Sequence, residues 1–393
     1  MRGLMEHWCH QETFLCWKGI VMKGNHFFNR HGSIVVLGLT LFCWIFMTTE
    51  SLARRSYVSP EQQHQLSRIH TVLITTVLIL PEGVEIPSVI QQVVRDRLLD
   101  VGLVVVLDAT QSYDAEIRVT CEEEKRETAT TRYGGDAELS FAPDRLWRGA
   151  ACLLGYRLGG KDLGWYQEVR AGGQSSMQES GDSKRRERLV HQLADELARF
   201  DFPVFLLSEW GQTEPLLALL RSPQTNLQRK QRILEEFRYL PAPEGKTLFL
   251  QLIDHPELSE PSIGALAGLG APAILVLQEL FEDHTRHASV RAAAAKGLGQ
   301  VGLSTSDFQA LQPLLAYLAM LLKKLQASTE IEFDVLGEVV WAVGQVHHDD
   351  TFRLIDDLQG KLWVIYDTSP EMQELREKVS VVHKYVDLRA RIL

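Results

Sequence analysis

The 393-residue sequence predicts an α+β protein, in which a small α/β module precedes an all-α array of repeated helices. Residues 71–80, TVLITTVLIL, form a continuous apolar run rich in β-branched side chains, which is typical of a buried strand. Later in the chain, helical stretches rich in small residues recur at equal spacing, which indicates stacked helix pairs. We therefore expect a leader at 1–53, a linker at 54–70, the α/β module at 71–200 and the array at 201–393.

The leader has the layout of an export signal. A basic stretch precedes the apolar residues 34–47, and Ser51 and Ala53 supply small side chains at the −3 and −1 positions of a cleavage site. This order predicts a signal peptide over Met22–Ala53 that is cleaved before Arg54. The protein is then expected in the periplasm or otherwise outside the cytoplasm.

Two features of the leader leave alternatives open. Residues 1–21 have crowded tryptophan, cysteine and histidine side chains without periodicity, and we interpret them as an over-extended gene start. The apolar core has 14 residues, whereas a bilayer-spanning helix needs about 20. An uncleaved signal anchor, which would make the protein a membrane-tethered scaffold, is the alternative to cleavage.

The charge and cysteine content narrow the range of partners and compartments. The net charge of −10 argues against a nucleic-acid partner, because its phosphates would be repelled. Of the 5 cysteines, Cys121 and Cys152 follow the predicted cleavage site, and both lie in predicted strands. In an oxidising compartment they could form a disulfide, and two buried thiols are the alternative.

The α/β module is expected to begin with a β-α-β unit. The strand at 71–80 reads as buried on both faces, and Pro87 then begins a helix that Gly102 ends. Residues 103–107 form the second, parallel strand of a right-handed crossover. Residues 115–122 alternate between apolar and polar side chains, as in a half-exposed strand.

The rest of the module is expected to hold two hairpins, 126–141 and 150–169, and a closing amphipathic helix that ends near Phe200. The segments Val101-Gly102-Leu103 and Tyr113-Asp114-Ala115 make this module similar to the N-terminal domain of TolB and to related modules of bacterial envelope proteins. That resemblance implies an envelope location.

The array is organised around residues 290–302, VRAAAAKGLGQVG, a predicted helix with a small-residue face. The face lets a neighbouring helix approach closely, and Gly299 and Gly302 are interpreted as helix-ending residues. Copies of the pattern are found before and after it. Aligned positions, separated by 29, 29 and 45 residues, are Leu240, Leu269, Leu298 and Val343.

These segments resemble the second helix of HEAT-like repeats of the short, phycobilisome-lyase type. The resemblance covers residues 201–393 and implies a HEAT-like helical-repeat array that binds another macromolecule. It carries no lyase activity to this chain, since no cysteine lies beyond Cys152 to handle a bilin. No cofactor is expected.

No catalytic, cofactor-binding or metal-binding motif is present in the sequence. The cluster His347-His348-Asp349-Asp350 has metal-ligand residue types, but we interpret it as a loop between repeat helices. The basic run 184–188 is interpreted as a solvated first turn of a helix. If the protein were an enzyme, the carboxylates near strand ends, Asp108, Asp114 and Glu116, would be the candidates.

The sequence thus favours an exported, non-enzymatic scaffold or adaptor that binds a protein partner through its array. An enzyme with an unrecognised site in the α/β module and a membrane-tethered scaffold are the alternatives. The partner itself is not identified by any motif.

Overall fold

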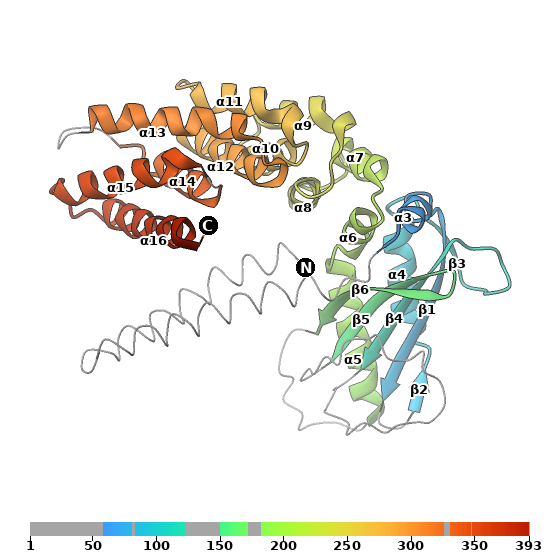
Figure 1. Ribbon diagram of the computed structural model, residues 1–393. Helices are drawn as coiled ribbons and strands as arrows, with labels where there is room; N and C mark the ends of the chain where they lie inside the picture. The colour runs from blue at the N-terminus through green and yellow to red at the C-terminus, as the bar shows by residue number, and fades with distance from the viewer. Residues whose placement is uncertain are drawn as a thin grey trace. The chain divides into compact units, whose positions relative to one another are not determined.

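The computed structural model describes residues 58–80, 83–122, 150–171, 182–325, 331–346 and 348–392. They form an α+β protein that divides into two compact units, Met1–Gln212 and Thr213–Leu393 (Figure 1). The first unit contains a mixed sheet and the second is a helical array. The predicted leader, with its cleavage site between Ala53 and Arg54, lies outside the described residues, as does the predicted hairpin at 126–141.

The first unit is built on one mixed sheet whose strands run in the order β2-β1-β4-β5-β6, with β3 also paired to β1. Strand β1 is parallel to β3 and β4, whereas β4, β5 and β6 are successively antiparallel. The strands are β1 (Thr71–Leu80), β2 (Gly83–Glu85), β3 (Val104–Val106), β4 (Ala115–Glu122), β5 (Ala151–Leu158) and β6 (Lys161–Arg170). The helices of this unit are α3 (Pro60–Leu66), α4 (Ser88–Leu99), α5 (Asp182–Arg199) and α6 (Phe202–Glu209).

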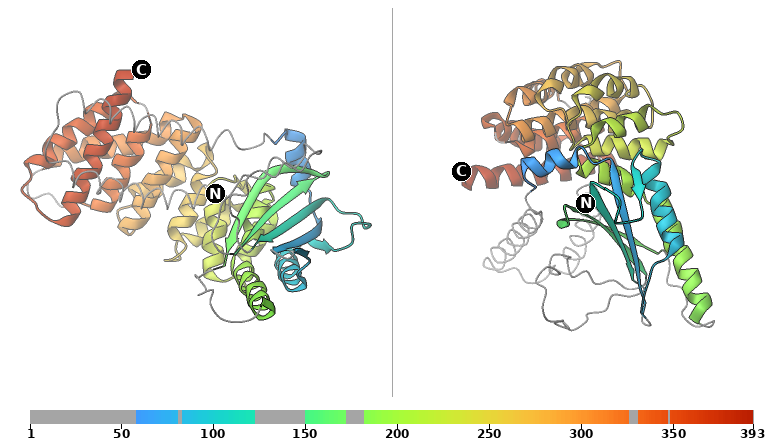
Figure 2. Two further views of the ribbon diagram at one scale, coloured as in Figure 1. Left: turned by 90° about the horizontal axis from the view of Figure 1, so that it is seen from below. Right: turned by 90° about the vertical axis from the view of Figure 1, so that its right-hand side faces the viewer.

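The predicted β-α-β unit is confirmed by β1, α4 and β3. The two strands are parallel neighbours, with Thr71 opposite Val104, and α4 packs on both of them. Helix α5 packs against α4, and both helices lie on the same side of the sheet (Figure 2). The alternation predicted for β4 is also confirmed, since every second side chain from Ala115 is buried.

The prediction that β1 is buried on both faces is wrong. Its even-numbered side chains, from Val72 to Leu80, are buried, whereas Ile79 is 38% exposed. In the described part of the chain, α4 and α5 cover the face on which the even-numbered side chains lie. The apolar run at 71–80 therefore forms a strand with one fully buried face.

Residues 54–70, predicted as a linker, include a packed helix. Helix α3 begins with a capping box, in which the Ser59 hydroxyl accepts from the Gln62 backbone and the Gln62 side chain accepts from Ser59. Leu66 at its end is completely buried. The buried Gln212 amide donates to the carbonyls of Leu66 and Ile69, at 3.0 and 2.9 Å. These contacts join the segment to the first unit.

The boundary between the units follows Gln212 and not residue 200 as predicted. Helix α6 belongs to the first unit because its apolar residues are buried there, on both sides of the helix. Trp210, just after α6, is fully buried and meets the ring of Tyr156 edge-on at 5.6 Å between centroids. The sequence does not show this boundary, because an all-apolar helix such as α6 has no periodicity to indicate which domain buries it.

The second unit consists of consecutive helix pairs. The first helices of the pairs are α7 (Thr213–Arg221), α9 (Lys246–Leu252), α11 (Ile274–Glu282), α13 (Gln312–Lys324) and α15 (Asp349–Val364). The second helices are α8 (Leu227–Phe237), α10 (Ser259–Ala267), α12 (Ala288–Thr305), α14 (Phe333–Gln345) and α16 (Pro370–Ile392). Each second helix packs against the next one along the array, from α8 to α16 (Figures 1 and 2).

Small residues set the close approach between these second helices, as the sequence predicted. A Cβ atom on Gly299 would lie 2.4 Å from the Cβ of Ala342 in α14, and one on Gly344 would lie 2.3 Å from a methyl of Val382 in α16. The prediction that Gly299 and Gly302 end their helix is wrong, because both lie inside α12. Helix α12 continues to Thr305 and ends at Ser306, whose φ of 55° is left-handed.

Candidate functional site

The structure contains the disulfide between Cys121 and Cys152, with an S–S distance of 2.08 Å. The two residues lie directly opposite each other on the antiparallel strands β4 and β5, and both are fully buried. The bond therefore belongs to the core of the first unit. A thiol at either position is not available as a nucleophile in this state.

The three carboxylates considered for catalysis each have a separate local role. Asp114 Oδ2 accepts from the backbone N–H groups of His70 and Thr71 at 2.9 and 2.8 Å, which ties β4 to the start of β1. Asp108 accepts from the Thr110 backbone, and this hydrogen bond lowers the pKa of Asp108. The exposed turns around Asp108 and Asp114 thus use these carboxylates as caps.

Glu116 lies on the sheet face opposite the one whose side chains form the core, among other charged side chains. It accepts from the Thr75 hydroxyl at 2.9 Å, and Arg118 Nε lies 3.6 Å from its Oε1. On β6, Tyr166 donates to Asp162 at 2.5 Å, and burial together with this hydrogen bond raises the pKa of Tyr166. Alternation along β4 indicated a polar face, but the cross-strand register that gathers these groups is a tertiary property.

The remaining predicted clusters also have local partners. His348 caps α15, with its Nδ1 accepting from the Asp350 backbone at 3.2 Å, while His347 lies outside the described residues. Within the described residues, no group of three or more potential ligands is placed to hold a metal ion. In the basic run 184–188, Arg186 forms an ion pair with Glu85 at 2.8 Å.

A buried charge in the array was not singled out from the sequence. Arg291 in α12 is 2% exposed, and its Nε donates to the Phe281 carbonyl at 3.0 Å. Its Nη1 donates to both oxygens of Glu332, which precedes α14, with 2.6 Å to Oε2. Burial, and then the charge of Glu332, raise the pKa of Tyr317 to about 12. This network joins successive helix pairs through their interior.

A second inter-repeat contact lies in the loops. Arg286 pairs with Asp254 at 2.6 Å and with Asp283 at 3.6 Å. The two aspartates are 29 residues apart in the sequence, which is the spacing of the repeats around them. Arg286 thus connects the loops of two successive helix pairs by binding an aspartate at the equivalent position of each loop.

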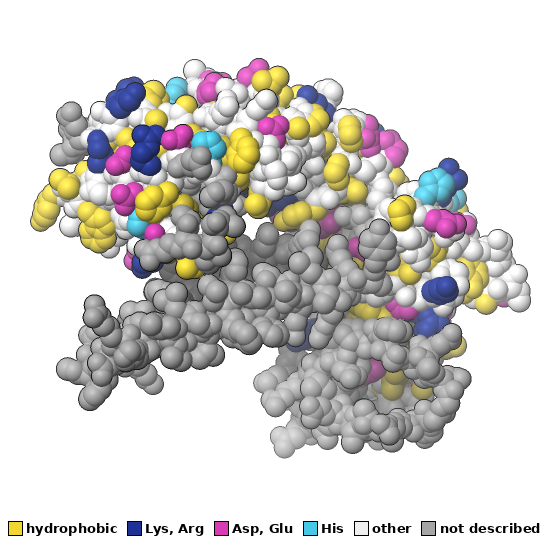
Figure 3. Space-filling view, in the orientation of Figure 1, with side chains coloured by type: hydrophobic (Ala, Val, Ile, Leu, Met, Phe, Trp, Pro, Cys, Tyr) yellow, Lys and Arg dark blue, Asp and Glu magenta, His cyan; other side chains and the backbone are white. Residues whose placement is uncertain are grey.

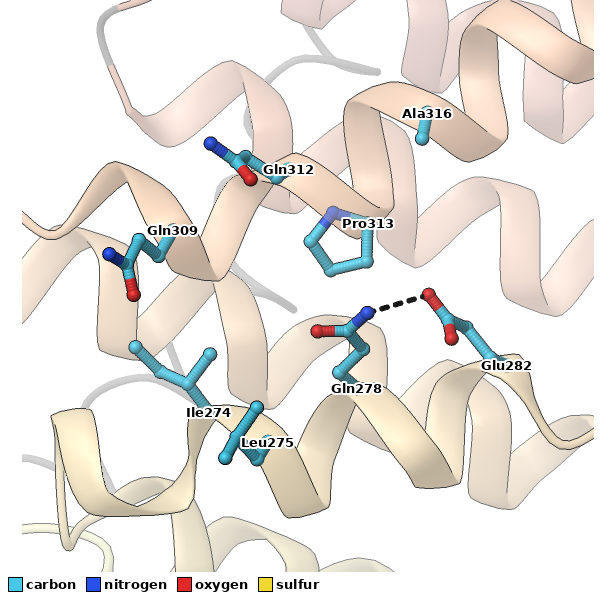
Figure 4. Close-up of a pocket in the computed structure, with 8 residues that line it drawn as sticks. All are labelled: Ile274, Leu275, Gln278, Glu282, Gln309, Gln312, Pro313 and Ala316. Carbon is cyan, nitrogen blue, oxygen red and sulfur yellow. Dashed lines mark hydrogen bonds between the residues drawn. The ribbon is translucent and has the colours of Figure 1, made fainter.

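One shallow pocket, of about 360 Å³, lies between α11 and α13 (Figure 4). The Gln278 amide donates to Glu282 at 2.9 Å along its floor, and Leu275 beside it is 73% exposed. The remaining lining residues are Ile274, Gln309, Gln312, Pro313 and Ala316. The lining holds one carboxylate and neutral side chains, so the pocket has no nucleophile–base pair.

A second, larger depression of about 510 Å³ lies at the end of the array, and we call it the terminal groove. Its lining residues are Leu325, Asp356, Asp357, Gly360, Lys361, Val364 and Ile365. Hydrophobic side chains gather at this end of the array, around the end of α15 and the turn to α16 (Figure 3). In this segment, Trp363 is 65% exposed, Val364 86% and Tyr366 96%.

No family model matches this chain, and no curated protein matches it either. Among the described helices, none combines the length and the apolar character that crossing a membrane requires.

Proposed function

We propose that this protein is an exported, non-enzymatic adaptor whose HEAT-like array binds a protein partner. The signal-like leader supports the exported location, and the succession of helix pairs with a 29-residue spacing supports the array type. Arrays of this kind present extended surfaces, which suit them to binding macromolecules.

The observation that carries the proposal is the apolar surface on the last helices of the array. Among the residues that the structure describes from α14 onward, seven large apolar side chains are more than a third exposed: Trp341, Phe352, Trp363, Val364, Tyr366, Val381 and Tyr385. The most exposed of them, Trp363, Val364 and Tyr366, lie close together in the sequence at the end of α15, and contiguous exposed apolar residues mark interaction sites in soluble proteins. Four of the seven are tryptophan or tyrosine, which are enriched where binding energy is concentrated.

Site-specific photo-cross-linking tests this function. A photoreactive residue replaces Trp341, Val364 or Tyr385 in cells that express the full chain, and cross-linked polypeptides are identified by mass. Val84 on β2, which is 68% exposed, is the matched control in the first unit. We expect adducts with another polypeptide from the array positions and none from Val84. Adducts from Val84 alone, or from no position, would contradict the proposal.

The export step has its own test. N-terminal sequencing of the protein recovered from cells is expected to begin at Arg54, because Ala53 is the predicted −1 residue. An N-terminus that retains residues 34–47 would instead favour the membrane-tethered scaffold.

A further inference from the structure

Arg238, which caps the C-terminus of α8, differs from the other arginines of the array. Each of the others whose side chain is described has a partner. Arg221, Arg286, Arg291 and Arg353 pair with carboxylates, Arg376 and Arg389 donate to carbonyls, and Arg229 and Arg232 also have interactions. Arg238 has no such partner among the described residues, and its Nε is buried without an acceptor. A buried donor without a partner costs free energy and calls for an explanation.

A glycine on the next second helix makes room for this guanidinium. A Cβ atom on Gly264 of α10 would lie 2.9 Å from Nη2 and 3.0 Å from Nε of Arg238. The guanidinium therefore rests against the backbone of α10, and a larger residue at position 264 would displace it. A glycine inside a helix destabilises that helix. The chain thus combines two locally unfavourable features at one place, and such places are often functional sites.

The backbone of Arg238 is held by two other helices. A Cβ atom on Gly268 of α10 would lie 2.9 Å from the carbonyl oxygen of Arg238 and closer still to that of Phe237. The Gln300 amide of α12 donates to the same Arg238 carbonyl at 3.2 Å. Because α10 and α12 fix this position in the free protein, a ligand that binds the guanidinium orders little of the chain.

The carboxylates nearest to Arg238 along these helices do not neutralise it. Glu260, one turn before Gly264 on α10, pairs with Lys296 of α12 at 3.6 Å. Glu235, in the last turn of α8, is exposed and forms no ion pair with Arg238. A guanidinium presents paired N–H groups that match the two oxygens of a carboxylate. One carboxylate from outside the described chain would therefore complete the interactions of this side chain.

We propose that Arg238 binds one carboxylate of the protein partner, from an aspartate, a glutamate or the end of its chain. A single carboxylate is assigned because the net charge of −10 disfavours a strongly acidic partner surface. Tyr239, the next residue, is 44% exposed, and arginine and tyrosine are enriched where binding energy is concentrated. This inference rests on the proposed binding function of the array and adds a contact of defined chemistry at α8.

Arg238→Lys gives the contact a chemical readout. A carbodiimide joins an amine to a carboxylate that touches it and does not join arginine, and it is added to extracts of cells that express the full chain. We expect Arg238→Lys to gain an amide link from position 238 to a carboxylate of another polypeptide, located by mass spectrometry of the digested adduct. Leu303→Lys, at a position that is 57% exposed on α12, is the control and should gain no link to that carboxylate. A link to Glu235 or Glu260 of the same chain, or no link, would overturn the proposal.

Removing or moving the charge gives a second measurement, with a photoreactive residue in place of Tyr239. Arg238→Gln is expected to lower the yield of adducts with the partner at least about tenfold. Gly264→Ala keeps the charge but places a methyl group where the guanidinium rests, so it is also expected to lower the yield. Arg221→Gln removes the same charge from an exposed pair with Glu214 and should leave the yield unchanged. Equal yields from Arg238→Gln and the wild type, with equal circular dichroism spectra, would overturn the proposal.

The carboxylate contact and the general function fail in different ways. If photoreactive residues at Trp341, Val364 and Tyr385 cross-link to another polypeptide but Arg238→Lys gains no link, the contact is wrong and array binding stands. If no array position cross-links in the wild type, the proposed function itself is wrong. A link from position 238 to a second copy of this chain would assign the contact to a dimer and overturn the inference.

Discussion

Burial distinguishes the ion pairs of the array, and Arg291 is the buried case. Arg291 is almost fully buried, yet its partner Glu332 has 41% of its side chain exposed. A buried charge that loses its partner costs far more than an exposed pair is worth. The ion pair between Lys296 of α12 and Glu260 of α10, at 3.6 Å, provides the contrast, because both of its side chains are more than 40% exposed.

Glu332→Ala is expected to lower the free energy of unfolding by about 2–3 kcal/mol, because it leaves the Arg291 guanidinium buried without its carboxylate. This loss is smaller than for a fully buried pair, because water reaches the exposed side of Glu332. Glu260→Ala is the control and should change stability by less than about 1 kcal/mol. Urea unfolding followed by circular dichroism measures both, and equal losses would refute the buried network as the cause.

Tyr317 makes the array sensitive to alkali. Its pKa is raised from 10.0 to about 12 in the folded state, mainly by burial. The unfolded chain therefore loses the phenol proton first, and the stability associated with this group is lost as the pH rises from 10 through 12. Tyr317→Phe is expected to move the midpoint of alkaline unfolding to higher pH, as measured by far-ultraviolet circular dichroism. A lower midpoint would show that the hydroxyl stabilises the fold.

Elements of the array are spaced by their smallest side chains. Gly299 of α12 allows α14 to pack closely against it, and Gly344 of α14 does the same for α16. In α15, Gly360 faces open space, so the same residue type has opposite consequences in different helices.

Substituting alanine at Gly299 of α12 and at Gly360 of α15 is expected to change the free energy of unfolding in opposite directions. Gly299→Ala should destabilise the array by about 1–3 kcal/mol, because its Cβ would lie 2.4 Å from the Cβ of Ala342. Gly360→Ala should stabilise it by up to about 1 kcal/mol, through helix propensity alone. Thermal unfolding of both variants measures the effect. A destabilised Gly360→Ala variant would contradict the expectation that a methyl group at this position meets no neighbouring atom.

The whole molecule combines a unit closed by a disulfide with an array whose last pair exposes apolar side chains. The disulfide connects residues 31 positions apart, and closing a loop of that length restricts the unfolded chain. The array has no such link in the described residues, since both cysteines lie in the first unit. Reducing conditions should therefore affect the two units differently.

Counting thiols on the purified protein tests both the bond and the leader. After cleavage at Ala53, only Cys121 and Cys152 remain, so denatured, unreduced protein should show no free thiol and reduced protein two. An uncleaved chain from Met22 would add the Cys43 thiol. Replacing both paired cysteines by alanine should destabilise the first unit by about 3 kcal/mol. Two free thiols before reduction would contradict the pairing.

The sequence by itself determined the fold class, the β-α-β unit, the alternation of β4 and the small-residue helices of the array. Each of these depends on local periodicity or on residue size, which a linear pattern records. Tertiary structure decided where Gln212 ends the first unit, that α3 is part of it, and that α12 runs past Gly299. It also decided that Arg291 is buried and Gly360 open, because both depend on which helix lies alongside, and that is set by packing between residues far apart in the chain.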